Sequence, residues 1–183
     1  MNQSFPGRYT ARADPGTVVF GIGMRVNRLW AVHRWLRPTI NTARMWWYMQ
    51  HDRPDGYLNG YLYVYWRGVG MMQYWRDFES LEAFSHDRSQ PHLAAWRQLA
   101  ALTKADQTFG YWHETYRIEP GSYEAIYGSM PRFGLAAAGE HIPIADATHA
   151  ARSRLTGQSE ATPPIPSSEH HHPDWQVRTG ESG

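Results

Sequence analysis

Two aromatic-rich runs joined by a two-residue link place the strongest constraint on the fold. The runs cover residues 57–66 and 69–76, and Arg67-Gly68 joins them. Runs rich in aromatic and β-branched residues are typical of β-strands, and a two-residue link that contains glycine is typical of a tight hairpin. The sequence therefore predicts an antiparallel hairpin over residues 57–76.

Strand and helix patterns alternate on either side of this hairpin. Residues 17–26 and 110–118 are predicted strands. A helix is predicted after Asn27, and Pro38 is expected to kink or split it. A second helical stretch covers residues 78–87 and 91–102 with a break between them. In the first helix the apolar residues recur at spacings of three and four, so they are expected to share one face: Leu29, Val32, Leu36, Ile40, Ala43 and Trp47. His33 lies beside this face and is expected to be partly buried.

The resulting order is strand, helix, strand, strand, helix, strand. It predicts an α+β fold of the ferredoxin-like βαββαβ type, in which both helices cover one face of an antiparallel sheet. The other face would carry many of the 9 Trp and 11 Tyr residues. Because a large exposed aromatic patch is unusual in a monomer, we expect a homodimer that packs the two sheets together through residues 57–76.

The length of 183 residues suits one domain. Residues 1–15 are predicted to form an irregular N-terminal arm, and residues 16–157 the ferredoxin-like α+β domain. Residues 158–183 are rich in Ser, Pro and Gly without periodicity, which predicts a disordered tail. The histidine run at 170–172 lies in this tail and is more typical of a solvated tract than of a metal site.

Composition argues against several functional classes. A formal net charge of +1 argues against nucleic acid as a partner. No apolar run is long enough to span a bilayer, so we expect no membrane partner. The first residues lack the pattern of a signal peptide, which predicts a cytoplasmic protein. The chain has no cysteine, which removes disulfides, thiolate metal sites and cysteine nucleophiles.

His113 has the most suggestive setting of the ten histidines. It lies in the middle of the strand predicted over residues 110–118, among aromatic residues. A histidine in such a strand suits an axial haem ligand whose second nitrogen is held by Glu114 or by a backbone carbonyl. A core histidine bound to a carbonyl is the alternative, and spacing alone favours it. Strand alternation puts two sets on opposite faces: Tyr111, His113 and Thr115 on one, and Trp112, Glu114 and Tyr116 on the other.

Four segments resemble a bacterial and fungal family labelled monooxygenase-like or phenylacetaldoxime-dehydratase-like. They read PGRYTARADPGTVVFGIGMRVNRLWAVHRWL, MMQYWRDFESLEAF, PHLAAW and YWHETYRIEPGSYEAIYGSMPRFGLAAAG. The resemblance runs from about Pro6 to Gly157. It implies the dimeric α+β barrel fold, which agrees with the element order derived above.

The second half is also similar to the C-terminal half of haem-containing aldoxime dehydratases. Residues 112–115 stand where a Tyr-His-Glu-Val strand supplies the proximal haem histidine of those enzymes, which implies that His113 is the axial ligand of a haem b. Met130 stands in the place of their distal catalytic histidine, so the acid–base group for dehydration is missing. Gln73 aligns with the serine that binds the substrate oxime. Arg76 is expected near the substrate or a haem propionate, unless it forms a structural ion pair with Asp77 or Glu79.

Three functions remain open on these grounds. The first is a haem-dependent enzyme, either a monooxygenase-like oxidoreductase or a dehydratase-like lyase, acting on a small organic substrate. Its candidate catalytic residues are Gln73, Arg76 and Met130, and His113 would bind the cofactor. The second is a cofactor-independent monooxygenase of the antibiotic-biosynthesis type, whose electron-rich polycyclic substrate activates oxygen itself. The third is a non-enzymatic binder of haem or another small molecule.

Overall fold

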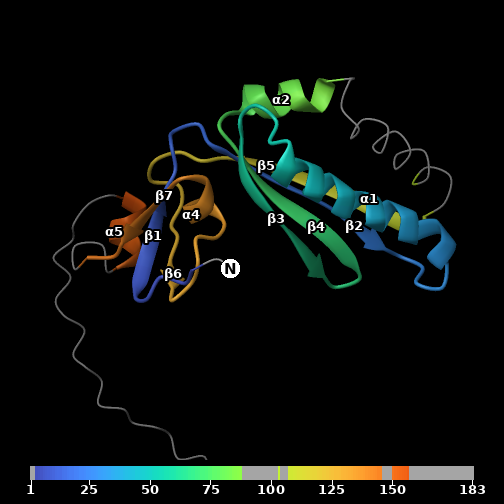
Figure 1. The fold of residues 1–183 in the computed structure, drawn as a ribbon, viewed down its shortest axis with the longest axis horizontal. Coiled ribbons are helices and arrows are strands. Elements are labelled where there is room, and N and C mark those ends of the chain that lie inside the picture. The colour runs from blue at the N-terminus through green and yellow to red at the C-terminus, as the bar shows by residue number, and fades with distance from the viewer. Residues whose placement is uncertain (1–2, 88–102, 104–106, 146–149, 157–183) are drawn as a thin grey trace, which may run out of the picture.

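The computed structural model describes residues 3–87, 103, 107–145 and 150–156. Within these residues the chain forms an α+β fold with a four-stranded and a three-stranded antiparallel sheet (Figure 1). The helical stretch predicted at 91–102 and the tail predicted at 158–183 lie outside the described residues.

The four-stranded sheet contains the predicted hairpin. Its strands are β2 (Val18–Val26), β3 (Tyr57–Tyr65), β4 (Gly68–Trp75) and β5 (Phe109–Arg117), in the order β3-β4-β2-β5. All neighbours are antiparallel. β3 and β4 form the hairpin, with an irregularity in the pairing between Tyr57 and Asn59.

Two helices cover one face of this sheet. They are α1 (Val32–His51) and α2 (Phe78–His86). Met49 of α1 and Leu81 of α2 pack with Val18 and Trp75 of the sheet in a buried cluster. The principal core therefore lies between the helices and the sheet, as the predicted ferredoxin-like arrangement requires.

The face of α1 that contacts the sheet is not the apolar one identified in the sequence. Val32, Leu36, Ile40 and Trp47 are exposed, and His33 beside them is exposed as well. Residues such as Thr39 and Thr42 face the sheet instead, with their hydroxyls 3.8 and 3.9 Å from the sulfur of Met24. The threonine hydroxyls donate to the carbonyls of Trp35 and Pro38, one turn earlier. These bonds satisfy the hydroxyls within the helix, so a polar side chain can face the core.

The second sheet joins the two ends of the described chain. It contains β1 (Arg8–Arg12), β6 (Tyr127–Gly128) and β7 (Glu140–Pro143) in the order β6-β1-β7, with α4 (Leu135–Ala138) and α5 (Ala151–Thr156) nearby. The expectation of an irregular arm over residues 1–15 is therefore wrong for residues 8–12. β1 has little apolar alternation of its own, and both of its edges are paired with segments that are distant in the sequence.

Candidate functional site

The sheet face opposite α1 carries a layer of aromatic side chains, which we call the aromatic face: Tyr61, Tyr63, Tyr65 and Trp112. One row of paired residues shows how it is built. Tyr63 lies opposite Gly70, Gly70 opposite Gly23, and Gly23 opposite Trp112. Two outer strands thus supply aromatic residues, and two central strands supply glycines between them.

The glycines let the rings lie against the backbone. A Cβ atom on Gly23 would lie 2.9 Å from Nε1 of Trp112, and one on Gly70 would lie 2.8 Å from the ring of Tyr63. Hydrogen bonds then fix the rings. Trp112 Nε1 donates to the Tyr65 hydroxyl at 2.6 Å, and that hydroxyl donates to the carbonyl of Met24 at 2.9 Å. The aromatic face is therefore a preformed surface.

A carboxylate lies on the same face, one row along β5. Glu114 is opposite Gly21, and its Oε2 accepts a hydrogen bond from the Tyr116 hydroxyl at 2.5 Å. This bond raises the pKa of Tyr116, since ionising the phenol would remove the donor. Burial raises the pKa of Tyr63, and the neighbouring phenols and Glu114 add to the shift. The face thus combines neutral phenols with a side chain that can accept a proton.

The second sheet covers one end of this face. Tyr61 contacts Phe133 with ring centroids 4.4 Å apart. Tyr74 is buried with Ala11 and Leu135 in a second cluster, and burial strongly raises its pKa, so it stays protonated. The aromatic face is therefore closed at the Tyr61 end and continues across β4 and β2 toward Trp112.

The predicted haem ligand lies on the other side of the four-stranded sheet. His113 is opposite Ile22, on the face that α1 covers, and its ring centroid is 5.8 Å from that of Phe20. The alternation predicted around His113 therefore agrees with the register. Glu114 faces the other way and is bound to Tyr116, so it does not orient the His113 ring.

Gln73 shares the α1 side of the sheet with His113. It lies opposite Phe20, is buried, and accepts a hydrogen bond from Trp75 Nε1 at 3.0 Å. Phe20 therefore stands between Gln73 and His113. The carboxamide oxygen of Gln73 is engaged with the core rather than directed at a bound molecule.

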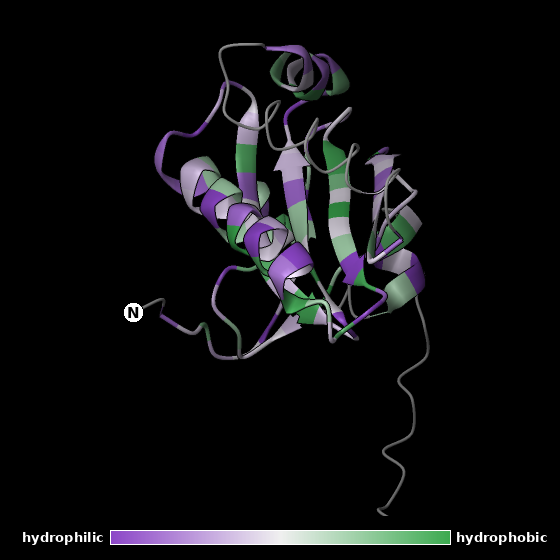
Figure 2. Cartoon of the chain, turned by 90° about the vertical axis from the view of Figure 1, so that its right-hand side faces the viewer, coloured by the Kyte–Doolittle hydropathy of each residue, from purple (hydrophilic) through white to green (hydrophobic). Residues whose placement is uncertain are grey.

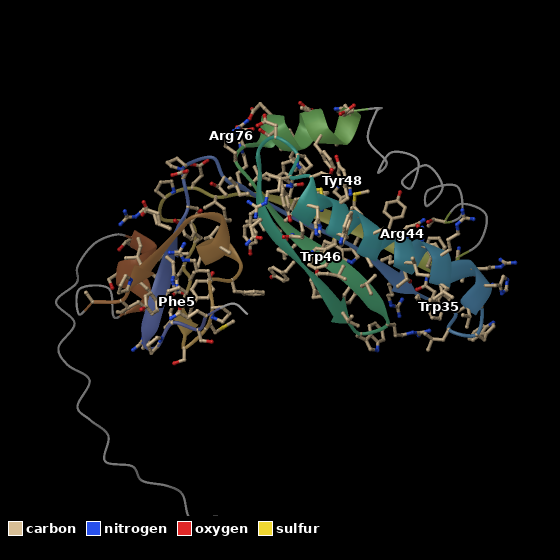
Figure 3. All side chains as sticks on the ribbon, viewed as in Figure 1. Phe5, Trp35, Arg44, Trp46, Tyr48 and Arg76 are labelled. Carbon is tan, nitrogen blue, oxygen red and sulfur yellow. The ribbon has the colours of Figure 1, made fainter. Side chains whose placement is uncertain are left out.

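The other two predicted residues lie elsewhere. Arg76 donates to Asp77 at 2.9 Å, to Asp55 at 3.2 Å and to Ser80 at 2.9 Å, beside the start of α2 (Figure 3). Met130 follows β6, and its carbonyl accepts from the amide of Phe5 at 3.1 Å. The structure thus brings Gln73 and His113 to one face of the sheet and places Arg76 and Met130 apart from them. Within the described residues, no group of three or more His, Asp or Glu side chains could hold a metal ion.

The Arg76 group predicts a pH dependence of stability. Asp77 caps α2, accepting from the Ser80 amide at 2.7 Å, and bonds from Ser80 and Arg76 lower its pKa to about 2. A carboxyl whose pKa is lowered by folding stabilises the protein above its unfolded pKa, and that stabilisation is lost as pH falls through the folded pKa. We expect Asp77→Asn to lower the free energy of unfolding at pH 6 and to have little effect near pH 2. Urea unfolding at both pH values measures this, and an equal loss at both would contradict it.

Sequence reasoning treated the tyrosines of residues 57–76 only as a dimer surface and did not connect them with Trp112. The available signal was glycine at positions 21, 23 and 70 in two predicted strands, with Gly68 in the link next to the second one. Glycine at alternating positions of a strand indicates close approach of another group.

Comparisons with known proteins agree with this fold. A family model described as "Monooxygenase af470-like" matches residues 17–135, which include the whole four-stranded sheet. No curated protein matches the sequence. Among solved structures, the aldoxime dehydratase OxdRE in complex with butyraldoxime is 13% identical, with a TM-score of 0.58 over 73% of this chain and 39% of that one.

Two smaller structures are also similar. SnoaB, a cofactor-independent oxygenase from Streptomyces nogalater, is 15% identical, with a TM-score of 0.36 over 57% of this chain and 94% of that one. A dimeric ferredoxin-like protein from an uncultured marine organism is 13% identical, with a TM-score of 0.37 over 56% and 94%. At such identities these likenesses concern the fold alone.

Proposed function

The chain belongs to the monooxygenase af470-like family, and from this premise we propose that it is an oxygenase that acts on a planar, electron-rich organic substrate without a bound cofactor. The observation that carries the proposal is the aromatic face with Glu114 beside it. Flat aromatic molecules stack on fixed aromatic rings, and Tyr65 and Trp112 are held in place by their hydrogen bonds. Preformed surfaces of this kind bind without the cost of ordering side chains.

Glu114 supplies the proton transfer that such a reaction needs. A polycyclic phenol or anthrone becomes a strong electron donor once it loses a proton, and its anion can pass electrons to O2 directly. In the net reaction of an anthrone, a ring CH2 group becomes a carbonyl, one oxygen atom of O2 enters the product and the other leaves as water. Glu114 would accept the proton, with Tyr116 holding the carboxylate in position.

The proposal includes a homodimer in which the aromatic faces of two copies meet. Closing the two sheets together would exclude water from a substrate bound between them, which strengthens electrostatic interactions at the site. Sedimentation equilibrium at micromolar concentration is expected to give a dimer. A monomer under these conditions would contradict this part of the proposal.

Oxygen consumption tests the oxygenase. Purified protein treated with a chelator and showing no haem absorbance is mixed with anthrone, and O2 uptake is followed with an electrode. We expect uptake above the buffer rate, and Glu114→Gln is expected to lower it by about 100-fold or more, the usual contribution of a general base. Glu140→Gln is the control, because Glu140 is an exposed carboxylate paired with Arg12 in the second sheet. Uptake only after addition of haem would overturn the proposal.

A haem held by His113 is the second candidate, favoured by the exposed position of His113 beside Phe20. The residues present do not fit a haem clamped between His113 and Met130. Met130 follows β6 of the second sheet, and that sheet packs against Tyr61 and Tyr74 on the opposite side of the four-stranded sheet. A haem would therefore bind through His113 alone and supply an iron atom for oxygen or oxime. Haemin titration followed by visible spectroscopy tests this. A Soret shift lost in His113→Ala but kept in His86→Ala would support it.

A further inference from the structure

The outward side of α1 carries a continuous exposed apolar stripe, which we call the α1 stripe: Val32, Leu36, Ile40 and Trp47. Their side chains are between 43% and 56% exposed. Spacings of four, four and seven residues place them on one side of the helix, away from Met49 and the sheet. Figure 2 shows α1 crossing the near side of the sheet with hydrophobic and hydrophilic residues on its outward surface.

Two exposed tryptophans lie at the end of the sheet where the chain enters α1. Trp30, just before α1, is 79% exposed, and Trp66, in the β3–β4 turn, is 72% exposed. The turn lies beside the segment that leads into α1, because the Arg67 side chain donates to the carbonyl of Asn27 at 2.7 Å. The guanidinium of Arg25 covers the Trp66 ring at 4.5 Å. Apolar and cationic groups therefore occur together at this end.

Arginines predominate in the segments that form this surface, and Asp52, directly after α1, is the acidic residue nearest to the helix in the sequence. Residues 15–51 and 56–76 contain no Asp or Glu. Because the whole chain has a net charge of only +1, the acidic residues are concentrated in other segments. Arg37 and Arg44 lie along one flank of the α1 stripe, and Arg44 is visible on α1 in Figure 3. Residues 15–51 and the β3–β4 turn contain six arginines: Arg25, Arg28, Arg34, Arg37, Arg44 and Arg67.

We propose that α1 and the β3–β4 turn bind the surface of an anionic lipid membrane. A basic helix with an exposed apolar side has the composition of helices that lie in the membrane interface, and tryptophan is enriched at that depth. Arginines near the membrane surface are attracted to anionic headgroups. Within the described residues no helix has the length and apolar character needed to cross a bilayer, so the contact is peripheral.

This proposal departs from the expectation of no membrane partner, which rested on the lack of a spanning segment. A second copy of the chain is a poorer occupant of the α1 stripe. It would bring two arginine-flanked surfaces together without an acidic residue from either α1, and like charges oppose association. The proposal does not depend on the proposed oxygenase activity.

Vesicle co-sedimentation of the full chain tests the proposal. Vesicles of phosphatidylcholine alone are compared with vesicles of equal parts phosphatidylcholine and phosphatidylglycerol. We expect at least about tenfold more protein on the anionic vesicles, a blue shift of tryptophan emission on binding, and loss of binding as salt is raised. Equal binding to both kinds of vesicle, or binding to neither, would overturn the proposal.

Three variants locate the surface. The pair Leu36→Glu with Ile40→Glu, and separately the pair Arg37→Glu with Arg44→Glu, are each expected to reduce binding about tenfold or more. Ile126→Glu is the matched control, because Ile126 is 47% exposed but lies before β6 in the second-sheet unit. Unchanged circular dichroism confirms that each variant is folded. A dimer that dissociates in Leu36→Glu with Ile40→Glu would show that a second copy covers the stripe, and would overturn the proposal.

Discussion

Replacing Trp75 with alanine is expected to lower the free energy of unfolding by about 3–5 kcal/mol, the usual cost of removing a buried tryptophan. Trp75 is 0% exposed at the end of β4. Its ring meets Tyr57 edge-on with centroids 5.5 Å apart and lies 5.1 Å from Phe84. The substitution also removes the Nε1 donor of buried Gln73, and leaving that acceptor unpaired adds to the loss.

Trp66→Ala is the matched control for this prediction. Trp66 is the same residue type in the same hairpin but is 72% exposed, so its loss is expected to change stability by no more than about 0.5 kcal/mol. Urea unfolding followed by circular dichroism measures both variants. Similar urea midpoints for Trp75→Ala and Trp66→Ala would show that Trp75 is not a centre of the core.

Gly68→Ala is expected to lower the free energy of unfolding by about 1–3 kcal/mol, the usual range for overpacked positions. A Cβ atom on Gly68 would lie 2.1 Å from the backbone carbonyl of Met24 and 2.9 Å from the Tyr65 ring. The Met24 carbonyl belongs to the neighbouring strand and cannot move without disturbing the β2–β4 pairing. The near-ultraviolet circular dichroism of the aromatic face should change as well, because Tyr65 binds Trp112.

Gly128→Ala provides the comparison for Gly68. A Cβ atom on Gly128 would meet no atom within 4 Å, so alanine is expected to be tolerated there. Thermal and urea unfolding of the two variants should separate them clearly. Equal stability of Gly68→Ala and wild type would mean that the end of the hairpin can shift without cost.

The ferredoxin-like order of strands and helices could be predicted, because each element is indicated by a local sequence pattern. The hairpin follows from two runs and a turn, and α1 follows from its apolar periodicity. The orientation of α1 relative to the sheet could not be predicted, because periodicity identifies an apolar side of a helix without showing what covers that side. In this chain Thr39 and Thr42 face the sheet while Leu36 and Ile40 face outward.

The candidate site was predictable only in part, for a similar reason. Alternation correctly separates His113 from Trp112, but it does not say which of the two faces α1 covers. That depends on the register of β2 and on side chains from other elements. The aromatic face needed the pairing of four strands, since its rings come from β3 and β5 and its glycines from β2 and β4.

The placement of β1 has a consequence for how the protein is made. β1 is the central strand of the second sheet, and Tyr9 pairs with Tyr127 on one side and with Pro143 on the other. The four-stranded sheet is complete once residue 117 has been synthesised, because β5 ends there. β1 is synthesised before both of its partners, so its pairing requires a long loop-closure step. During synthesis both edges of β1 therefore stay without their native partners until residues 127–128 and then residues 140–143 have been added.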